Sequence, residues 1–130
     1  MMAMSPTART MQHFKRKQWA LWNTETWDPR LRIRRDAFGF IDLVVLDMDR
    51  RKHLGLQVTS YSNISARVRK IRNQRRQNAL AWIYTGGVVE VWGWKEYADR
   101  ASGGDWAGCW WRPRIVEITE DDLRRAPSQD

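Results

Sequence analysis

Residues 39–45 have the sequence GFIDLVV and residues 55–60 have the sequence GLQVTS, and these two stretches decide the fold. The first lies in a nearly continuous apolar run at residues 38–46, which is typical of a strand covered on both faces. Apolar residues alternate with small or polar ones through residues 53–60, and this alternation predicts a partner strand. We therefore expect the two stretches to form paired strands.

Spacing and turn residues predict further elements on either side of these strands. They are, in chain order, a helix from Ser5 to about Leu21, a strand at 22–27, a basic ribbon or arm at 30–36, a helix from Ser62 or Asn63 to about Asn78, strands at 79–84 and 88–95, and a late edge strand at 109–118. The order is helix, three strands, helix, two strands (αβββαββ). It predicts an α/β fold with a mixed central sheet flanked by helices.

The length of 130 residues is that of one domain, which we place at residues 1–125 with a frayed tail at 126–130. Lys and Arg number 23 against 15 Asp and Glu, a net charge of +8. Residues 117–130 contain five acids and two bases, so the rest of the chain carries +11. Such a field attracts polyanions, which makes nucleic acid the leading partner; a solubilising surface is the alternative.

Several classes of protein are disfavoured by composition. Cys109 is the single cysteine, so no internal disulfide can form, and His13 and His53 are poorly spaced for zinc. We find no signal-peptide core and no apolar stretch of membrane-spanning length. We expect a soluble cytoplasmic protein, in the host cytoplasm if a phage encodes it.

Asp42 is the residue most in need of explanation. A carboxylate within an apolar strand costs several kcal/mol unless it is paired, hydrogen-bonded or bound to a cation. If the two strands pair through their turn, Gln57 places a neutral oxygen beside it. Oxygen ligands of this kind suit Mg²⁺ or Mn²⁺. An ion pair between Asp42 and one of the arginines is the other interpretation.

The two strand stretches resemble the motif strands of the PD-(D/E)XK nuclease superfamily, which includes restriction endonucleases and Holliday-junction resolvases. Shorter patterns also resemble small uncharacterised phage and bacterial proteins. They are RRDAFGFID at 34–42, QVTS at 57–60, RVRKI at 67–71 and VWGW at 91–94. The likeness covers residues 19–95. It implies a restriction-endonuclease-like core and a divalent-metal-dependent nuclease acting on DNA, and by analogy a homodimer.

The resemblance assigns roles residue by residue. Asp42 matches the metal-binding aspartate, Gln57 stands where the family has an acidic ligand, and Thr59 stands where it has a lysine. An amide adds no negative charge and a threonine cannot replace an ammonium. We expect Lys70 or Arg67 to supply the missing cation and Glu25 to supply a second carboxylate for the metal. A degenerate, inactive site is the competing interpretation.

Basic residues on the arm and on the second helix are expected to neutralise phosphates. They are Arg32, Arg34, Arg35, Arg67, Arg69, Lys70, Arg72, Arg75 and Arg76. A solvated helix face is the alternative for each arginine, and Asp36 is expected to pair with Arg34 or Arg35 at the surface. Three functions therefore stay open: a nuclease, a nucleic-acid-binding module without turnover, and a phage-type protein that binds a host partner.

Overall fold

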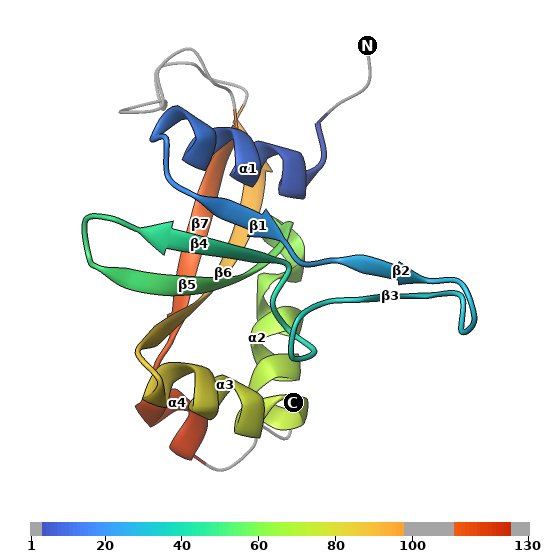
Figure 1. Cartoon of the computed structure of the whole chain (residues 1–130), viewed down its shortest axis with the longest axis vertical. Coiled ribbons are helices and arrows are strands. Elements are labelled where there is room, and N and C mark those ends of the chain that lie inside the picture. The colour runs from blue at the N-terminus through green and yellow to red at the C-terminus, as the bar shows by residue number, and fades with distance from the viewer. Residues whose placement is uncertain (1–3, 98–110, 126–130) are drawn as a thin grey trace.

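The computed structural model describes residues 4–97 and 111–125 and contains one five-stranded sheet, one separate two-stranded hairpin and helices on both sides of the sheet (Figure 1). The elements are α1 Pro6–Arg16, β1 Leu21–Asn23, β2 Thr26–Asp28, β3 Ile33–Arg35, β4 Leu43–Asp47, β5 Lys52–Ser60, the 3-10 turn η1 Tyr61–Asn63, α2 Ile64–Gln74, α3 Arg76–Tyr84, β6 Gly87–Glu96, β7 Trp111–Ile118 and α4 Glu120–Arg124.

The sheet has the strand order β1-β4-β5-β6-β7. β5 and β6 run parallel, and the other neighbours are antiparallel. A parallel pair needs a crossover connection, which α2 and α3 supply. The predicted mixed α/β sheet flanked by helices is therefore confirmed, and β4 and β5 pair as expected, with Leu43 opposite Leu56.

Two apolar cores lie on the two faces of the sheet. Phe14 of α1 packs on one face against a cluster that includes Leu56 and Trp92. Ile71 of α2 and Leu123 of α4 pack on the other face, which continues to α3. Alternation along each strand explains the division, because successive side chains point to opposite faces. Figure 1 places α1 at one end of the molecule and α3 and α4 at the other.

The first helix begins as predicted. Ser5 caps it by accepting a hydrogen bond from the Ala8 backbone N–H at 3.1 Å, and Pro6 occupies the first turn. The helix ends at Arg16 rather than near Leu21, because Leu21 pairs with Val45 in β1.

The expected strand at residues 79–84 is wrong: this stretch lies in α3. Ala79, Trp82 and Ile83 pack together against the α2 side of the sheet, and their i, i+3, i+4 spacing suits a helix. The expected long helix to Asn78 is interrupted at Arg75, whose φ of −125° ends α2 before α3 begins. The two strands after the crossover are instead β6 and β7; residues 109–110 of the predicted edge strand lie outside the described residues.

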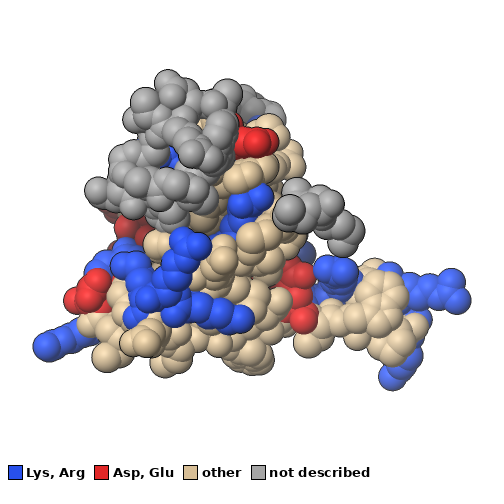
Figure 2. All heavy atoms as spheres, turned by 90° about the horizontal axis from the view of Figure 1, so that it is seen from above, with Lys and Arg blue, Asp and Glu red and all other residues tan. Residues whose placement is uncertain are grey.

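The expected strand at residues 22–27 is divided between two sheets. β1 belongs to the main sheet, whereas β2 pairs with β3 in a separate hairpin. Thr24 marks the division: its hydroxyl donates to the backbone oxygen of Ile41 and accepts a hydrogen bond from the Ala37 N–H at 3.2 Å. The basic arm predicted at residues 30–36 is thus one half of a projecting hairpin, and the blue side chains on this hairpin in Figure 2 are arginines.

None of the described helices is long and apolar enough to cross a membrane. The tail expected at residues 126–130 lies outside the described residues.

Candidate functional site

A cavity of about 330 Å³ opens where the residue before β4, the middle of β5, the helix α2 and the base of the hairpin meet. It is lined by Glu25, Arg34, Arg35, Asp36, Gly39, Asp42, Gln57, Val58, Arg67, Lys70 and Arg75. Residues that are far apart in the sequence, and that the resemblance links to a metal and a phosphate, therefore share one cavity.

Asp42 lies at the floor of this cavity and is 5% exposed. Its backbone N–H donates to the Leu56 oxygen at 2.8 Å, which fixes it beside β5. Its Oδ2 accepts hydrogen bonds from Gln57 Nε2 at 2.7 Å and from the Val58 N–H at 2.8 Å. Among the described residues no guanidinium or ammonium forms an ion pair with Asp42, so the ion-pair interpretation is wrong for this part of the chain.

The pKa of Asp42 is raised to about 7, mainly by burial and to a smaller extent by the nearby carboxyl of Glu25. The hydrogen bonds from Val58 and Gln57 act in the opposite direction but do not compensate for the lost hydration. Asp42 is thus divided between its acid and carboxylate forms near neutral pH. A cation placed beside it would favour the carboxylate.

Gln57 has a polar atom without a partner. The side chain is 3% exposed, its nitrogen is used by Asp42, and no donor among the described residues reaches its buried Oε1. A buried acceptor without a donor costs free energy, about 1–3 kcal/mol. A cation is one way to satisfy this oxygen.

Glu25 follows Thr24 in the link between β1 and β2, and it is half-buried. Its Oε2 lies 3.5 Å from Arg34 Nη1, and its carboxyl raises the pKa of Asp42 through its charge and through a side-chain hydrogen bond. The predicted second carboxylate therefore reaches the site, although from a link rather than from a strand.

The three oxygen groups Asp42, Glu25 and Gln57 fit a hard divalent cation such as Mg²⁺ or Mn²⁺. Two carboxylates and one neutral amide make a modest ligand set. The described residues contain no group of three or more His, Cys, Asp and Glu side chains placed to hold a metal ion. Additional oxygens would have to come from water or from a substrate phosphate, as is usual for Mg²⁺.

The rim of the cavity is positively charged. Five cationic side chains and three acidic ones, the floor residue Asp42 included, line the cavity as a whole, which leaves a formal excess of two positive charges. Arg67 and Lys70 come from one flank of α2, as predicted, and Arg34 and Arg35 come from the hairpin. Arg75 is held in place by a hydrogen bond from its Nε to the Gly39 oxygen at 3.1 Å.

Thr59 is not among the lining residues. It is buried, two residues beyond Gln57 on β5. The cations that reach the cavity come instead from α2, the hairpin and the bend at Arg75.

Asp36 is a lining residue whose part in the site sequence reasoning missed. The expected pairing with Arg34 or Arg35 is wrong, because Arg34 pairs with Glu25 and Arg35 Nε pairs with Asp28 Oδ2 at 3.2 Å. The usable signal was its position six residues before Asp42, just ahead of a turn in which the Ala37 N–H bonds the Ile41 oxygen.

The other predicted phosphate contacts separate into three places. Arg32 is exposed at the tip of the hairpin. Arg69 and Arg72 face a second hollow. Arg76 has a structural role, since its Nε donates to the Arg72 oxygen at 3.2 Å and its Nη2 donates to the Arg125 oxygen at 2.6 Å.

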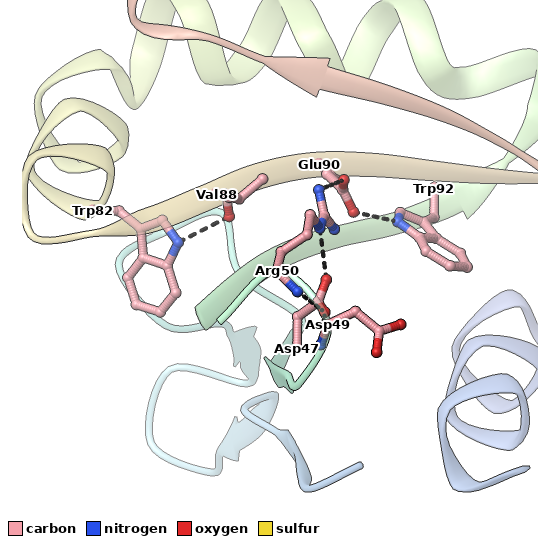
Figure 3. Close-up of polar contacts among 7 residues, drawn as sticks. All are labelled: Asp47, Asp49, Arg50, Trp82, Val88, Glu90 and Trp92. Atoms are coloured by element: carbon pink, nitrogen blue, oxygen red, sulfur yellow. Dashed lines mark hydrogen bonds and ion pairs between the residues drawn. The ribbon is translucent and has the colours of Figure 1, made fainter. Parts of the chain in front are cut away.

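A second group of buried acids lies on the other face of the sheet, and the sequence did not reveal it (Figure 3). Arg50 bridges them: its Nε donates to Asp47 Oδ2 at 2.6 Å and its Nη1 donates to Glu90 Oε2 at 3.2 Å. Trp92 Nε1 donates to the other Glu90 oxygen at 3.1 Å. Every carboxylate oxygen of this group has a partner, so its role is structural.

Comparison of the chain with protein-family models, with curated proteins and with solved structures gave no match. The chemistry of the site is therefore argued from its own residues. An acidic floor suited to a cation, below a cationic rim suited to phosphates, is an arrangement that can bind and polarise a phosphodiester.

Proposed function

We propose that this chain is a divalent-metal-dependent nuclease, an endonuclease or junction-resolvase-like enzyme, that hydrolyses phosphodiester bonds in DNA. One observation carries the proposal: Asp42 is buried without a cationic partner among the described residues, beside the unpaired Oε1 of Gln57 and below a cationic rim. A buried acid is expensive unless something compensates it. The missing partner is best explained as a metal ion.

Asp42, Glu25 and Gln57 would hold Mg²⁺ or Mn²⁺ through their side-chain oxygens. When bound, such an ion supplies Lewis-acid activation of water and of the phosphoryl group at neutral pH. The amide nitrogen of Gln57 and the Val58 N–H hold Asp42 Oδ2 in one orientation. This fixed geometry leaves the acid little freedom to turn away from the cavity.

Lys70 and Arg67 are the residues of the chain that would stabilise the charge developing on the attacked phosphate. Both come from α2 and line the cavity, three residues apart and so on the same side of the helix. Arg34, Arg35 and Arg75 would hold neighbouring phosphates, a role that needs charge and little sequence information.

The order of elements also supports the proposal. In the main sheet the chain order is α1, the strands β1, β4 and β5, the helical crossover and then β6. The resemblance to PD-(D/E)XK nucleases implies the same order of helix, three strands, helix and strand. Asp42 precedes β4 and Gln57 lies on the neighbouring β5, as the two motifs require.

A DNA-binding module without turnover is the second candidate. Two observations favour it: Gln57 adds no negative charge for a metal, and no lysine stands at position 59. Both candidates require DNA binding at the rim of the cavity. They differ in whether the residues around Asp42 support metal-dependent cleavage.

The test is cleavage of labelled branched, single-stranded and duplex DNA with Mg²⁺, with Mn²⁺ or with a chelator. We expect metal-dependent cutting that Asp42→Asn reduces at least about a hundredfold. The matched control Asp121→Asn alters an exposed acid of α4 and should cut normally. Salt-sensitive binding without cutting by any of the three proteins would identify the module instead, and no binding at all would contradict both candidates.

A further inference from the structure

A second hollow, of about 300 Å³, lies between α2 and β7. Its lining residues are Ile64, Ser65, Val68, Arg69, Arg72, Arg114 and Val116. It shares no lining residue with the Asp42 cavity. The two depressions are therefore separate features of the surface.

They lie on opposite flanks of the same helix. With 100° between successive residues, Arg67 and Lys70 project to one side of the buried stripe of α2, and Arg69 and Arg72 project to the other. The sheet agrees with this division. α2 packs on β5 and β6, so the Asp42 cavity opens toward β4 and the second hollow toward β7.

The charge of the second hollow is unbalanced. Its three guanidinium groups, from Arg69, Arg72 and Arg114, face no acidic lining residue, and none forms an ion pair with a described residue. Arg114 lies over the Tyr61 ring, with 5.8 Å from its Cζ to the ring centroid. Three like charges collected in one depression repel one another unless an anion joins them.

Arg72 adds a second, independent observation. Its Nε is buried and has no acceptor among the described residues. A buried donor attached to a charged group is costly to leave unpaired. An oxyanion bound by the Arg72 guanidinium would relieve the repulsion among the three arginines, and it would satisfy the Nε donor if the side chain turned this atom toward the hollow. The planar, forked guanidinium matches phosphate oxygens particularly well.

We infer that this hollow is a second phosphate-binding site, which holds a backbone phosphate of the same nucleic acid whose attacked phosphate lies in the Asp42 cavity. The inference rests on the proposed function. The nucleic acid then crosses α2. A helix with its side chains is about 10–12 Å across, which corresponds to about three nucleotides at 3.4 Å per nucleotide of one strand.

The first arm of the test measures DNA binding against salt concentration. The variant is Arg69→Gln with Arg114→Gln, since both residues are exposed and Arg72 is left to maintain packing. All proteins carry Asp42→Asn so that DNA is not consumed. We expect the slope of log K against log salt to fall by about one or two, because each lost phosphate contact removes about one.

The matched control is Arg16→Gln with Arg51→Gln, two exposed arginines that line neither depression. It should change the slope by less than half as much. The two double variants could instead have equal slopes, while the Asp42→Asn parent binds DNA and the protein with its natural Asp42 cuts DNA. The inference of a second phosphate site would then be wrong, and the proposed function would stand.

The second arm uses inorganic phosphate alone and follows the thermal unfolding midpoint. Phosphate should raise the midpoint of the parent and control proteins more than that of Arg69→Gln with Arg114→Gln. Equal shifts in all three would overturn the site. A selective shift in a protein that binds no DNA would overturn the proposed function and identify free phosphate as the ligand of the hollow.

Discussion

Two buried acids, Asp42 and Asp47, lie at the two ends of β4. Asp42 immediately precedes the strand and Asp47 is its last residue, so the five-residue spacing directs them to opposite faces of the sheet. Both are 5% exposed. Arg50 forms an ion pair with Asp47, whereas the partners of Asp42 among the described residues are the Gln57 amide, the Val58 N–H and the carboxyl of Glu25.

Folding shifts the pKa values of the two acids in opposite directions. Burial alone would raise the pKa of Asp47, but hydrogen bonds from the Arg50 backbone and side chain and from the Asp49 N–H hold it below its ordinary value. Burial is the main cause that raises the pKa of Asp42 to about 7, and no ion pair with a cation of the described segments opposes it. Within the described ranges, Asp47 therefore has a cationic partner and Asp42 has none, and under the proposed function a divalent ion would take that place.

The largest expected effect on the free energy of unfolding comes from replacing aspartate by asparagine at each end of β4, in Asp42→Asn and in Asp47→Asn. In Asp42→Asn, the amide oxygen can keep both hydrogen bonds and its nitrogen can face Glu25. In the folded wild type Asp42 keeps its proton up to about pH 7, while the unfolded chain loses it near pH 4, so wild-type stability falls as pH rises between these values. At pH 8 without metal, Asp42→Asn should therefore be more stable by up to about 4 kcal/mol.

Asp47→Asn should change the free energy of unfolding at pH 8 in the opposite direction, so this variant should be less stable than the wild type. The pKa of Asp47 is lowered by folding, so its stabilisation is present above about pH 4 and is lost as pH falls further. Urea unfolding of both variants at pH 4 and pH 8 checks the pair. Destabilisation by both substitutions at pH 8 would mean that Asp42 already has a compensating partner within the chain.

Removal of the bridging cation is the next largest effect. Arg50→Ala leaves the carboxylates of Asp47 and Glu90 buried without a cationic partner from Arg50. Breaking a buried ion pair in this way costs about 3–5 kcal/mol. Because the Arg50 side chain is 44% exposed, we expect about 3 kcal/mol. Urea unfolding at pH 7 measures it, with exposed Arg51→Ala as the neighbouring control; equal losses in both would remove the special role of Arg50.

A divalent ion should stabilise one end of β4 only. Mg²⁺ at about 100 times its Kd raises the free energy of unfolding by about 2.7 kcal/mol. The rise should appear in wild type at pH 8, fade toward pH 5 as Asp42 is protonated, and vanish in Asp42→Asn. Asp47→Asn should keep it. Differential scanning fluorimetry across this pH range would contradict the metal site if all three proteins shifted alike.

Thr59 should give the smallest effect. It is buried but does not line the cavity, so Thr59→Ser should change stability by less than about 1.5 kcal/mol and leave DNA cleavage near wild type.

Lys70→Gln, which alters a lining cation, should slow cleavage at saturating DNA. Single-turnover assays of both variants decide which of the two positions serves the attacked phosphate.

Local patterns were enough to predict the elements that carry the site. The alternation in β5 and the apolar run before Asp47 specify two neighbouring strands, and a short turn brings Gln57 to Asp42. The basic helix after β5 was likewise visible from the spacing of Ile64, Val68 and Ile71. Each of these inferences depends on residues that are close in sequence.

The parts that escaped prediction depend on distant contacts. By composition, the run at residues 79–84 suits a strand and a helix equally well. It forms the helix α3 because its apolar side chains pack against the core beneath the sheet. β1 ends where Thr24 bonds to the backbone at Ile41, 17 residues away. Arg50 is three residues from Asp47 but 40 from Glu90, so the bridge cannot be read from either neighbourhood alone.

Gly39 couples the shape of the backbone to the electric potential of the cavity. It has a φ of +82°, and a Cβ at this position would lie 2.4 Å from Arg75 Nε. Even alanine would strain the turn and push the guanidinium off the rim. Position 39 thus controls how strongly the cavity attracts anions without carrying a charge itself, and a neutral substitution there should mimic the loss of an arginine.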